Sequence, residues 1–293
     1  MDRDETTSLT EGLIGIMRIN NNVMAFNASR NLSGTSMRIG KSLEKLSSGF
    51  RINRAADDAA GLVISQKLRA EIGGLKQATR NSQDGISLVQ TAEGALNEVH
   101  NMLGRMRDLA VQAANDTNDT AARTAIQSEM NALGAEIDRI GTDTTFGGAA
   151  LFTATALNFQ VGSEGSSGNQ ISITIGTLDA DSINSVDVTA FDFSTPATAA
   201  ADARDAIEDL DTAIAQISTT RGSLGAVQNR LESTIANLQV TTENLVASES
   251  RIRDTDMASE MVNFTKNQIL QQAGTSMLAQ ANALPQSVLS LLG

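Results

Sequence analysis

Apolar residues recur at helical spacing along most of the chain, with one long interruption in the middle. They step by three, four or seven residues over 32–50 and again over 68–113. Steps of this size place apolar side chains on one face of an α-helix. Gly49 lies near the end of the first run, and glycine is favoured just after the end of a helix. The pattern therefore predicts one helix that ends near residue 48 and a long helix that ends near residue 113.

A turn and a shorter helix follow. The segment NDTNDT at 115–120 consists of residues that favour turns and interrupt helices. Apolar residues resume at helical spacing over 126–140, so the two helices are expected to form an antiparallel hairpin. Arg105 and Leu109 are four residues apart and share one face of the first helix. The position of the turn places Glu129 level with Arg105 on the second helix.

The region 141–203 has a different character. It contains no Lys or Arg, is rich in Ser, Thr and Gly, and loses the helical period. Alternating apolar and polar residues at 171–175 and 186–193 predict strands. The helical spacing returns over 207–252 and 270–291. The sequence thus predicts a mainly α fold, in which the N- and C-terminal halves form a long antiparallel helical coiled-coil bundle with a small β-hairpin-rich middle insert.

Both ends of the chain carry coiled-coil seams that a single helix cannot hide from water. Such a stripe has to pack against another helix, either within the chain or on another copy. The stripes are rich in Ala and Leu, which permits close approach of many helices. We therefore predict that the chain associates with copies of itself through the seam residues Leu32, Ile39, Leu43, Leu46, Leu270, Ala273, Met277, Ala281, Leu284, Val288 and Leu291.

Composition excludes several function classes. The 22 basic and 34 acidic residues give a net charge of −12, which disfavours nucleic acid and anionic membrane surfaces as partners. The chain has no cysteine and one histidine, so disulfides, thiolate metal sites and metal motifs with two histidines are absent from it. Gln and Asn interrupt the uncharged residues after Lys266, which predicts an amphipathic helix and not membrane insertion. No catalytic residue, cofactor or metal is predicted, and an enzyme is nearly excluded.

Two polar features have a plain structural explanation. Asp57 and Asp58 precede a predicted helix, where carboxylates bind the free backbone N–H groups of the first turn. We favour this role over a catalytic carboxylate pair. His100 lies on the long predicted helix without a second histidine, and a surface or packing role is favoured over metal binding.

An ordered set of motifs resembles bacterial flagellin. The match covers roughly 17–150 and 202–293, and the ordered set is highly specific although no single fragment is unique. The motifs are LSSGFRIN (46–53), DDAAGL (57–62), TAEGALNEV (91–99), RMRDLAVQAAN (105–115), RGSLGAVQNRLEST (221–234), SRIRDTDMASEM (250–261), QILQQAGTSMLAQAN (268–282) and PQSVLSLL (285–292).

The resemblance implies a structural subunit that polymerises into the extracellular flagellar filament for swimming motility. It also implies export by flagellar type III secretion, and an export chaperone, a filament cap and hook-associated proteins as partners besides the chain itself. By the same resemblance, 17–56 with 251–293 form an inner filament-core coiled coil, 57–145 with 202–250 an outer core helical domain, and 146–201 a short β-containing insert. The family begins at the equivalent of residue 17, so 1–16 are expected to be a wrongly assigned start or a disordered extension.

Two alternatives remain at this point. A flagellar hook–filament junction protein shares the terminal helices, but the long C-terminal match favours flagellin. A type III membrane translocator would need longer uninterrupted apolar segments than this chain has.

The resemblance also marks a candidate receptor contact. In flagellins that activate Toll-like receptor five, the equivalents of Arg105, Leu109 and Glu129 form the main contact surface, and all three residue types are present here. The alternative is a solvated, salt-bridged helix face, which we favour for the intrinsic function of the chain.

Overall fold

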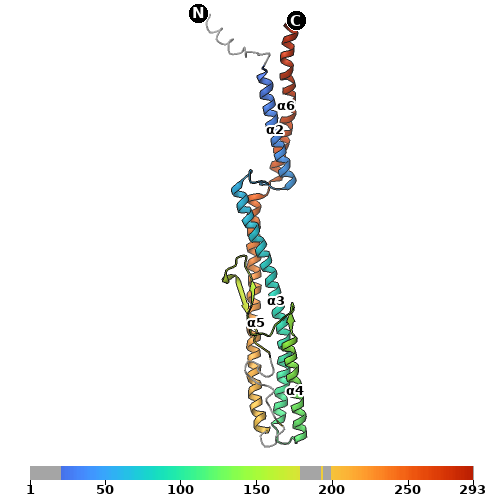
Figure 1. Cartoon of the computed structure of the whole chain (residues 1–293), viewed down its shortest axis with the longest axis vertical. Coiled ribbons are helices and arrows are strands. Elements are labelled where there is room, and N and C mark those ends of the chain that lie inside the picture. Colours follow the sequence, from blue (N-terminus) through green and yellow to red (C-terminus); the bar gives the residue numbers. More distant parts are fainter. Residues whose placement is uncertain (1–20, 179–192, 194–198, 293) are drawn as a thin grey trace. The chain divides into compact units, whose positions relative to one another are not determined.

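A computed structural model describes residues 21–178, 193 and 199–292 (Figure 1). The fold is mainly α, with long antiparallel helices and small β-hairpins between them, which confirms the predicted fold class. Its helices are α2 (Val23–Ser48), α3 (Ala59–Ala113), α4 (Thr120–Asp143), α5 (Ala199–Arg253) and α6 (Met257–Leu292). A short 3-10 turn, η1 (Ser167–Asn169), and the strands β1 (Thr145–Phe146), β2 (Ala149–Ala150), β3 (Leu157–Gln160) and β4 (Gln170–Ile173) complete the described elements.

The chain divides into two compact units. The terminal unit combines Met1–Leu68 with Ala247–Gly293, and the central unit is Arg69–Val246. The terminal unit joins two segments that are distant in sequence, whereas the central unit is one continuous segment.

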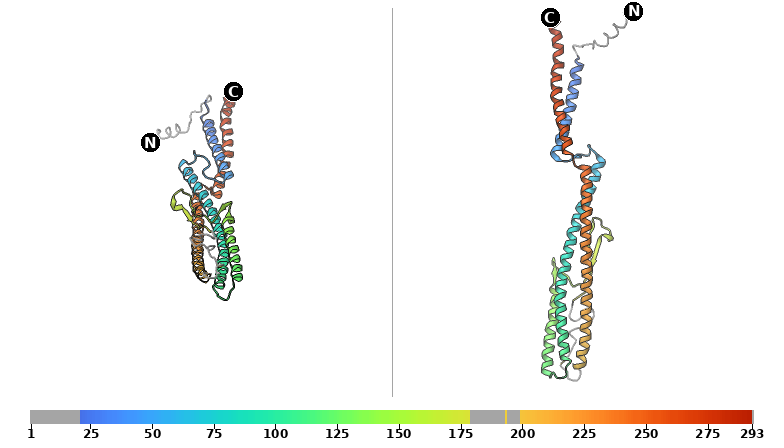
Figure 2. Two further views of the ribbon diagram at one scale, coloured as in Figure 1. Left: turned by 60° about the horizontal axis from the view of Figure 1, so that its bottom comes forward. Right: turned by 180° about the vertical axis from the view of Figure 1, so that it is seen from behind.

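The terminal unit pairs α2 with α6. The two helices run antiparallel and lie side by side in the views of Figures 1 and 2. Asn22 caps the start of α2, because its Oδ1 accepts the N–H of Ala25 at 3.1 Å. The helix ends at Gly49, whose left-handed backbone (φ 75°) lets its N–H bond to the carbonyl of Lys45 at 2.9 Å. The helix end predicted near residue 48 is confirmed.

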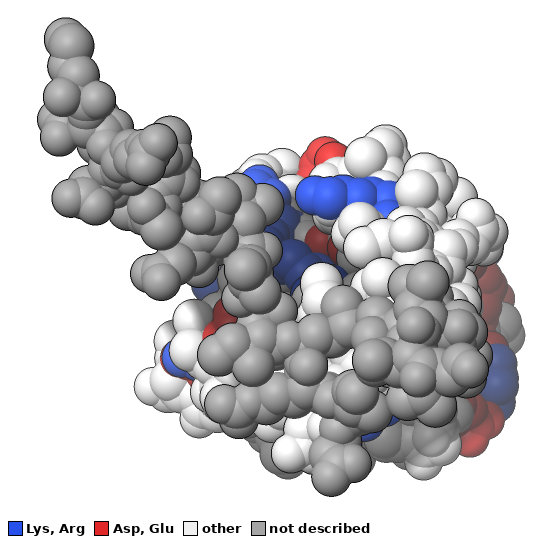
Figure 3. All heavy atoms as spheres, turned by 90° about the horizontal axis from the view of Figure 1, so that it is seen from above, with Lys and Arg blue, Asp and Glu red and all other residues white. Residues whose placement is uncertain are grey.

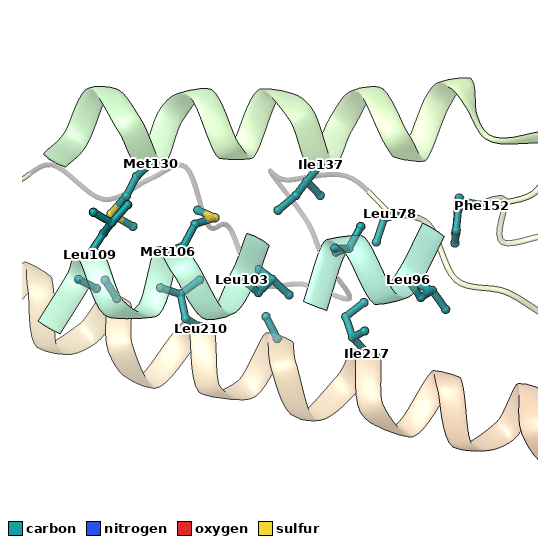
Figure 4. Close-up of a cluster of buried hydrophobic side chains, with 14 of the residues drawn as sticks. Leu96, Leu103, Met106, Leu109, Met130, Ile137, Phe152, Leu178, Leu210 and Ile217 are labelled. Atoms are coloured by element: carbon teal, nitrogen blue, oxygen red, sulfur yellow. The ribbon is translucent and has the colours of Figure 1, made fainter. Parts of the chain in front are cut away.

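The central unit is a bundle of α3, α4 and α5 around a continuous apolar core. In Figure 4, α3 lies between the other two helices, so that Met106 faces α4 and Leu210 of α5 packs from the opposite side. The side chain of Asp119 accepts the N–H of Ala122 at 2.8 Å and caps α4. The predicted turn at 115–120 and the helical hairpin on either side of it are therefore confirmed.

Two small hairpins belong to the same unit. Strand β3 pairs antiparallel with β4, with Phe159 opposite Ile171, and β1 pairs with β2. The strand predicted at 171–175 is present as β4, whereas the one predicted at 186–193 lies outside the described residues apart from Phe193. Gly141 is required where the chain passes α4, because a Cβ atom there would lie 1.9 Å from the carbonyl oxygen of Leu178.

Candidate functional site

The contact between α2 and α6 uses small and polar side chains. Asn22 Nδ2 donates to the carbonyl of Ala281 at 2.6 Å, and the buried hydroxyl of Ser42 donates to Oε1 of Glu260. A Cβ atom on Gly274 would lie 3.3 Å from Cδ1 of Leu32, so the helices approach closely there. The covered positions of α6 repeat every three or four residues at Glu260, Phe264, Asn267, Gln271, Gly274, Leu278 and Ala281.

The predicted seam is divided between this contact and the free surface. On α2, Leu32, Ile39 and Leu46 are half-buried and share the face that meets α6, whereas Leu43 is exposed. On α6, Ala281 is buried, but Leu270, Ala273, Met277 and Leu284 are exposed. Leu270 is 44% exposed and Met277 61% exposed. The side chains of Val288 and Leu291 lie outside the described part of the chain. An apolar stripe of α6 thus stays accessible in the single subunit.

A groove runs beside this stripe, between α2 and α6. Its first section, of about 580 Å³, is lined by Leu32 of α2 and by Leu270, Ala273 and Met277 of α6, among others. A second section of about 450 Å³ shares Arg38 and Leu270 with the first, so the two are continuous. Residues of the predicted seam therefore line both sides of a groove that a further helix could enter.

The second section of the groove is basic. It is lined by Arg38, Lys41, Lys45 and Lys266, with Glu260 as its one acidic residue. Glu260 is 3.7 Å from the Nζ atom of Lys45. Figure 3, which views the molecule from above, shows Lys and Arg atoms beside a hollow. In a chain of net charge −12, this local excess of positive charge attracts carboxylates.

The candidate receptor residues lie on α3 and α4. Arg105 Nε and Nη2 both donate to Oε1 of Glu129, at 2.9 and 2.8 Å, which confirms that the two residues are level across the hairpin. Both side chains are about half exposed. Leu109, in contrast, is 2% exposed and packs in the core beside Met130 (Figure 4). Of the three residues, Arg105 and Glu129 present their side chains to the surface.

The paired carboxylates organise the segment before α3. Asp58 Oδ1 accepts the N–H of Gly61 at 2.9 Å, as a helix cap does, and Asp57 Oδ2 accepts the N–H groups of Arg54 and Asn53 at 3.0 and 3.2 Å. The N–H groups of Arg54 and then Asn53 lower the pKa of Asp57. The predicted role at the first turn of the helix is confirmed for Asp58, whereas Asp57 binds backbone N–H groups of the segment before α3.

Neither a metal site nor a membrane span is found in the described residues. No three His, Asp or Glu residues in that part of the chain come together in a way that could hold a metal ion. His100 is half-buried on α3, and its Nδ1 atom has no hydrogen-bond partner there. None of the described helices combines the length and the apolar character that a bilayer crossing requires.

Sequence reasoning missed the face of α6 that meets α2. Most of its members, among them Gln271 and Gly274, are polar or small, so Phe264 and Leu278 alone do not register as an apolar seam. A search for small and polar residues at steps of three and four would have found the repeat.

Comparison with known proteins gives matches to both helical halves of the chain. Residues 19–156 match the bacterial flagellin N-terminal helical region, and residues 207–292 match the bacterial flagellin C-terminal helical region. The flagellin of Bacillus subtilis (strain 168) is 50% identical over 305 residues, covering 94% of this chain and 100% of the relative. The flagellar filament 33 kDa core protein of Treponema phagedenis is 45% identical over 291 residues, with the same coverage.

Among solved structures that share the fold is one of low sequence identity. It is a protein described as a flagellar hook-associated protein from Vibrio parahaemolyticus, with a TM-score of 0.57 and 14% identity over 68% of this chain and 100% of that one. The matches to both helical regions, together with relatives of high identity over their full length, give the assignment. This chain belongs to the bacterial flagellin family.

Proposed function

We propose that this chain is the structural subunit of a flagellar filament and that it polymerises through its terminal unit. The observation that carries the proposal is the stripe of α6 with Leu270 and Met277 exposed beside a groove. A large apolar stripe is costly to leave in water and marks a surface that becomes covered. The relatives named flagellin and flagellar filament core protein support a filament as the assembly. They do not favour a hook–filament junction protein or a membrane translocator.

The geometry of the groove suits an open polymer. When a groove on one copy binds a different surface of the next copy, the contact is heterologous. Such contacts build an open helical polymer unless the rotation between successive copies closes a ring. The flagellin family is a structural one, and no reaction is part of this function.

The finer assignments follow from the family resemblance. The subunit would then consist of an inner coiled-coil domain (17–56 with 251–293), an outer helical domain (57–145 with 202–250) and a short insert (146–201). The chain would be held by a chaperone and exported by the flagellar type III apparatus. In the flagellum it would contact the filament cap and hook-associated proteins.

Assembly of the purified chain tests the function. After salt-induced assembly, electron microscopy is expected to show filaments. Deleting residues 270–293 removes Leu270, Ala273 and Met277 but leaves the central bundle, so the truncated chain is expected to be a helical monomer that forms no filaments. Normal filaments from the truncated chain would contradict the role of α6.

The candidate receptor surface reduces to two residues. We propose that Arg105 and Glu129 contact Toll-like receptor five in the monomer. Arg105→Ala or Glu129→Ala is expected to weaken activation through loss of charge-assisted contacts, by about 1–3 kcal/mol each. A reporter assay on monomer measures this, with Arg139→Ala as a matched control, because Arg139 forms an equally exposed ion pair with Glu136 on α4. If the Arg105 and Glu129 variants signal like the control, the pair is only a solvated ion pair.

A further inference from the structure

Among the described methionines, those of the terminal unit are exposed, whereas those of the central unit are buried or, at Met102, half-buried. Five described methionines of the terminal unit are between 47% and 67% exposed: Met24, Met37, Met257, Met261 and Met277. In the central unit, Met106 is 0% and Met130 2% exposed. Exposed thioethers contribute little to the folding of a single subunit, but they are open to oxidants, which attack methionine sulfur according to its accessibility.

Two of the exposed methionines converge on one groove. Met24 of α2 and Met277 of α6 both line the section of about 580 Å³ between the helices. Leu32, Leu270 and Ala273 give the same section its apolar character. Met37, Met257 and Met261 line neither section of the groove. The pair therefore lies at the surface that the proposed assembly contact would cover, and the other three form a natural comparison set.

Oxidation would change the chemistry of this surface directly. A peroxide transfers one oxygen atom to the thioether sulfur: its O–O bond breaks, an S–O bond forms, sulfur is oxidised by two electrons, and the peroxide is reduced to water or an alcohol. The product, methionine sulfoxide, is polar and accepts hydrogen bonds. Sulfoxides at Met24 and Met277 would have to lose water before another helix could pack on this section. The side-chain donors of the section all lie on α2, whereas on α6 the neighbours of Met277, Leu270 and Ala273, have no side-chain donor to offer.

We propose that Met24 and Met277 form a peroxide-sensitive modification site that controls whether a free subunit can join a polymer. The reagent class is a hydroperoxide, with hydrogen peroxide as the simplest member. The inference rests on the proposed function, because it assigns a chemical control to the same surface. It acts on the subunit before addition, since packing covers the sulfur atoms afterwards. Reduction by a thiol-dependent sulfoxide reductase restores the thioether and the capacity to assemble.

The first experiment is independent of assembly. Monomer is treated with limiting hydrogen peroxide, and sulfoxide at each methionine is measured by peptide mass spectrometry over time. Met24 and Met277 are expected to oxidise at least about tenfold faster than Met106 and Met130, in line with exposure. Protection of Met24 and Met277 equal to that of the core methionines would overturn the proposal.

The second experiment uses matched variants. Leucine has nearly the volume of methionine and no sulfur to oxidise, so the critical concentration of Met24→Leu/Met277→Leu is compared with its own value before peroxide treatment. After peroxide treatment, the critical concentration for assembly should rise on the order of tenfold in the parent and stay unchanged in this variant. The comparison variant Met257→Leu/Met261→Leu should remain as sensitive as the parent.

The outcomes separate the two proposals. If the untreated parent does not form filaments, the proposed function fails. If the parent assembles equally well before and after oxidation of Met24 and Met277, or if the comparison variant alone gives resistance, the function stands and this inference is wrong. Treatment of the oxidised parent with sulfoxide reductase should return its critical concentration to the starting value, and failure to do so would also contradict the proposal.

Discussion

The variant Met277→Asp is expected to remain monomeric under conditions in which the parent chain forms filaments. Met277 is exposed in the subunit, so the substitution should leave its folding unchanged. In the polymer, the proposed packing would bury an unpaired carboxylate against the apolar wall formed with Leu270 and Ala273, at a cost of several kcal/mol. A cost of about 4 kcal/mol raises the critical concentration roughly a thousandfold. Sedimentation and electron microscopy measure the change.

Gln272→Asp provides a matched control for that variant. Gln272 lies on the same helix, is exposed, and lines neither section of the groove. The control adds the same charge at nearly the same place along α6, so it corrects for the effect of charge alone. Equal assembly of the two variants would show that the surface around Met277 stays in water in the filament.

A second large effect is expected in the central unit. Leu103 is fully buried between α4 and α5, and Leu103→Ala leaves a cavity that this narrow bundle cannot fill (Figure 4). The expected loss is about 2–5 kcal/mol of unfolding free energy, with a melting temperature lower by on the order of 10 °C. The chain has no Trp or Tyr, so circular dichroism of the monomer is the appropriate measurement.

Val111→Ala on the same helix is the control for Leu103→Ala. Val111 is 49% exposed, and a surface change of this kind is expected to stay within about 0.5 kcal/mol. If both variants melt at the same temperature as the parent, the core assigned to α3 is wrong.

Helix positions and ends were predictable because their determinants are local. The glycine after Ser48 and the polar turn at 115–120 stop their helices wherever the rest of the chain lies. The level placement of Arg105 and Glu129 followed from the length of that turn and the rise of a helix, with no knowledge of packing.

The partners of each helix were harder to predict. The resemblance placed Leu109 on a contact surface, yet α3 packs against α4 and α5 together, and its buried face includes Leu109. On α6, the most apolar stripe is not the one that meets α2. Gly274 lets the two helices approach closely, and the hydroxyl of Ser42 donates a hydrogen bond to the carboxylate of Glu260. The mainly polar and small face of α6 therefore packs against α2, while the more apolar face of α6 stays accessible.

The pairing of α2 with α6 also sets the order in which the subunit can fold. The hydrogen bond from Asn22 to Ala281 joins residues 259 positions apart, and the conformational entropy lost in closing a loop grows with its length. Packing of Leu75 and Ala78 against Leu238 closes most of that separation within the central unit. We therefore expect α2, which is synthesised first, to gain its partner last, after the central bundle has brought the two distant segments within reach.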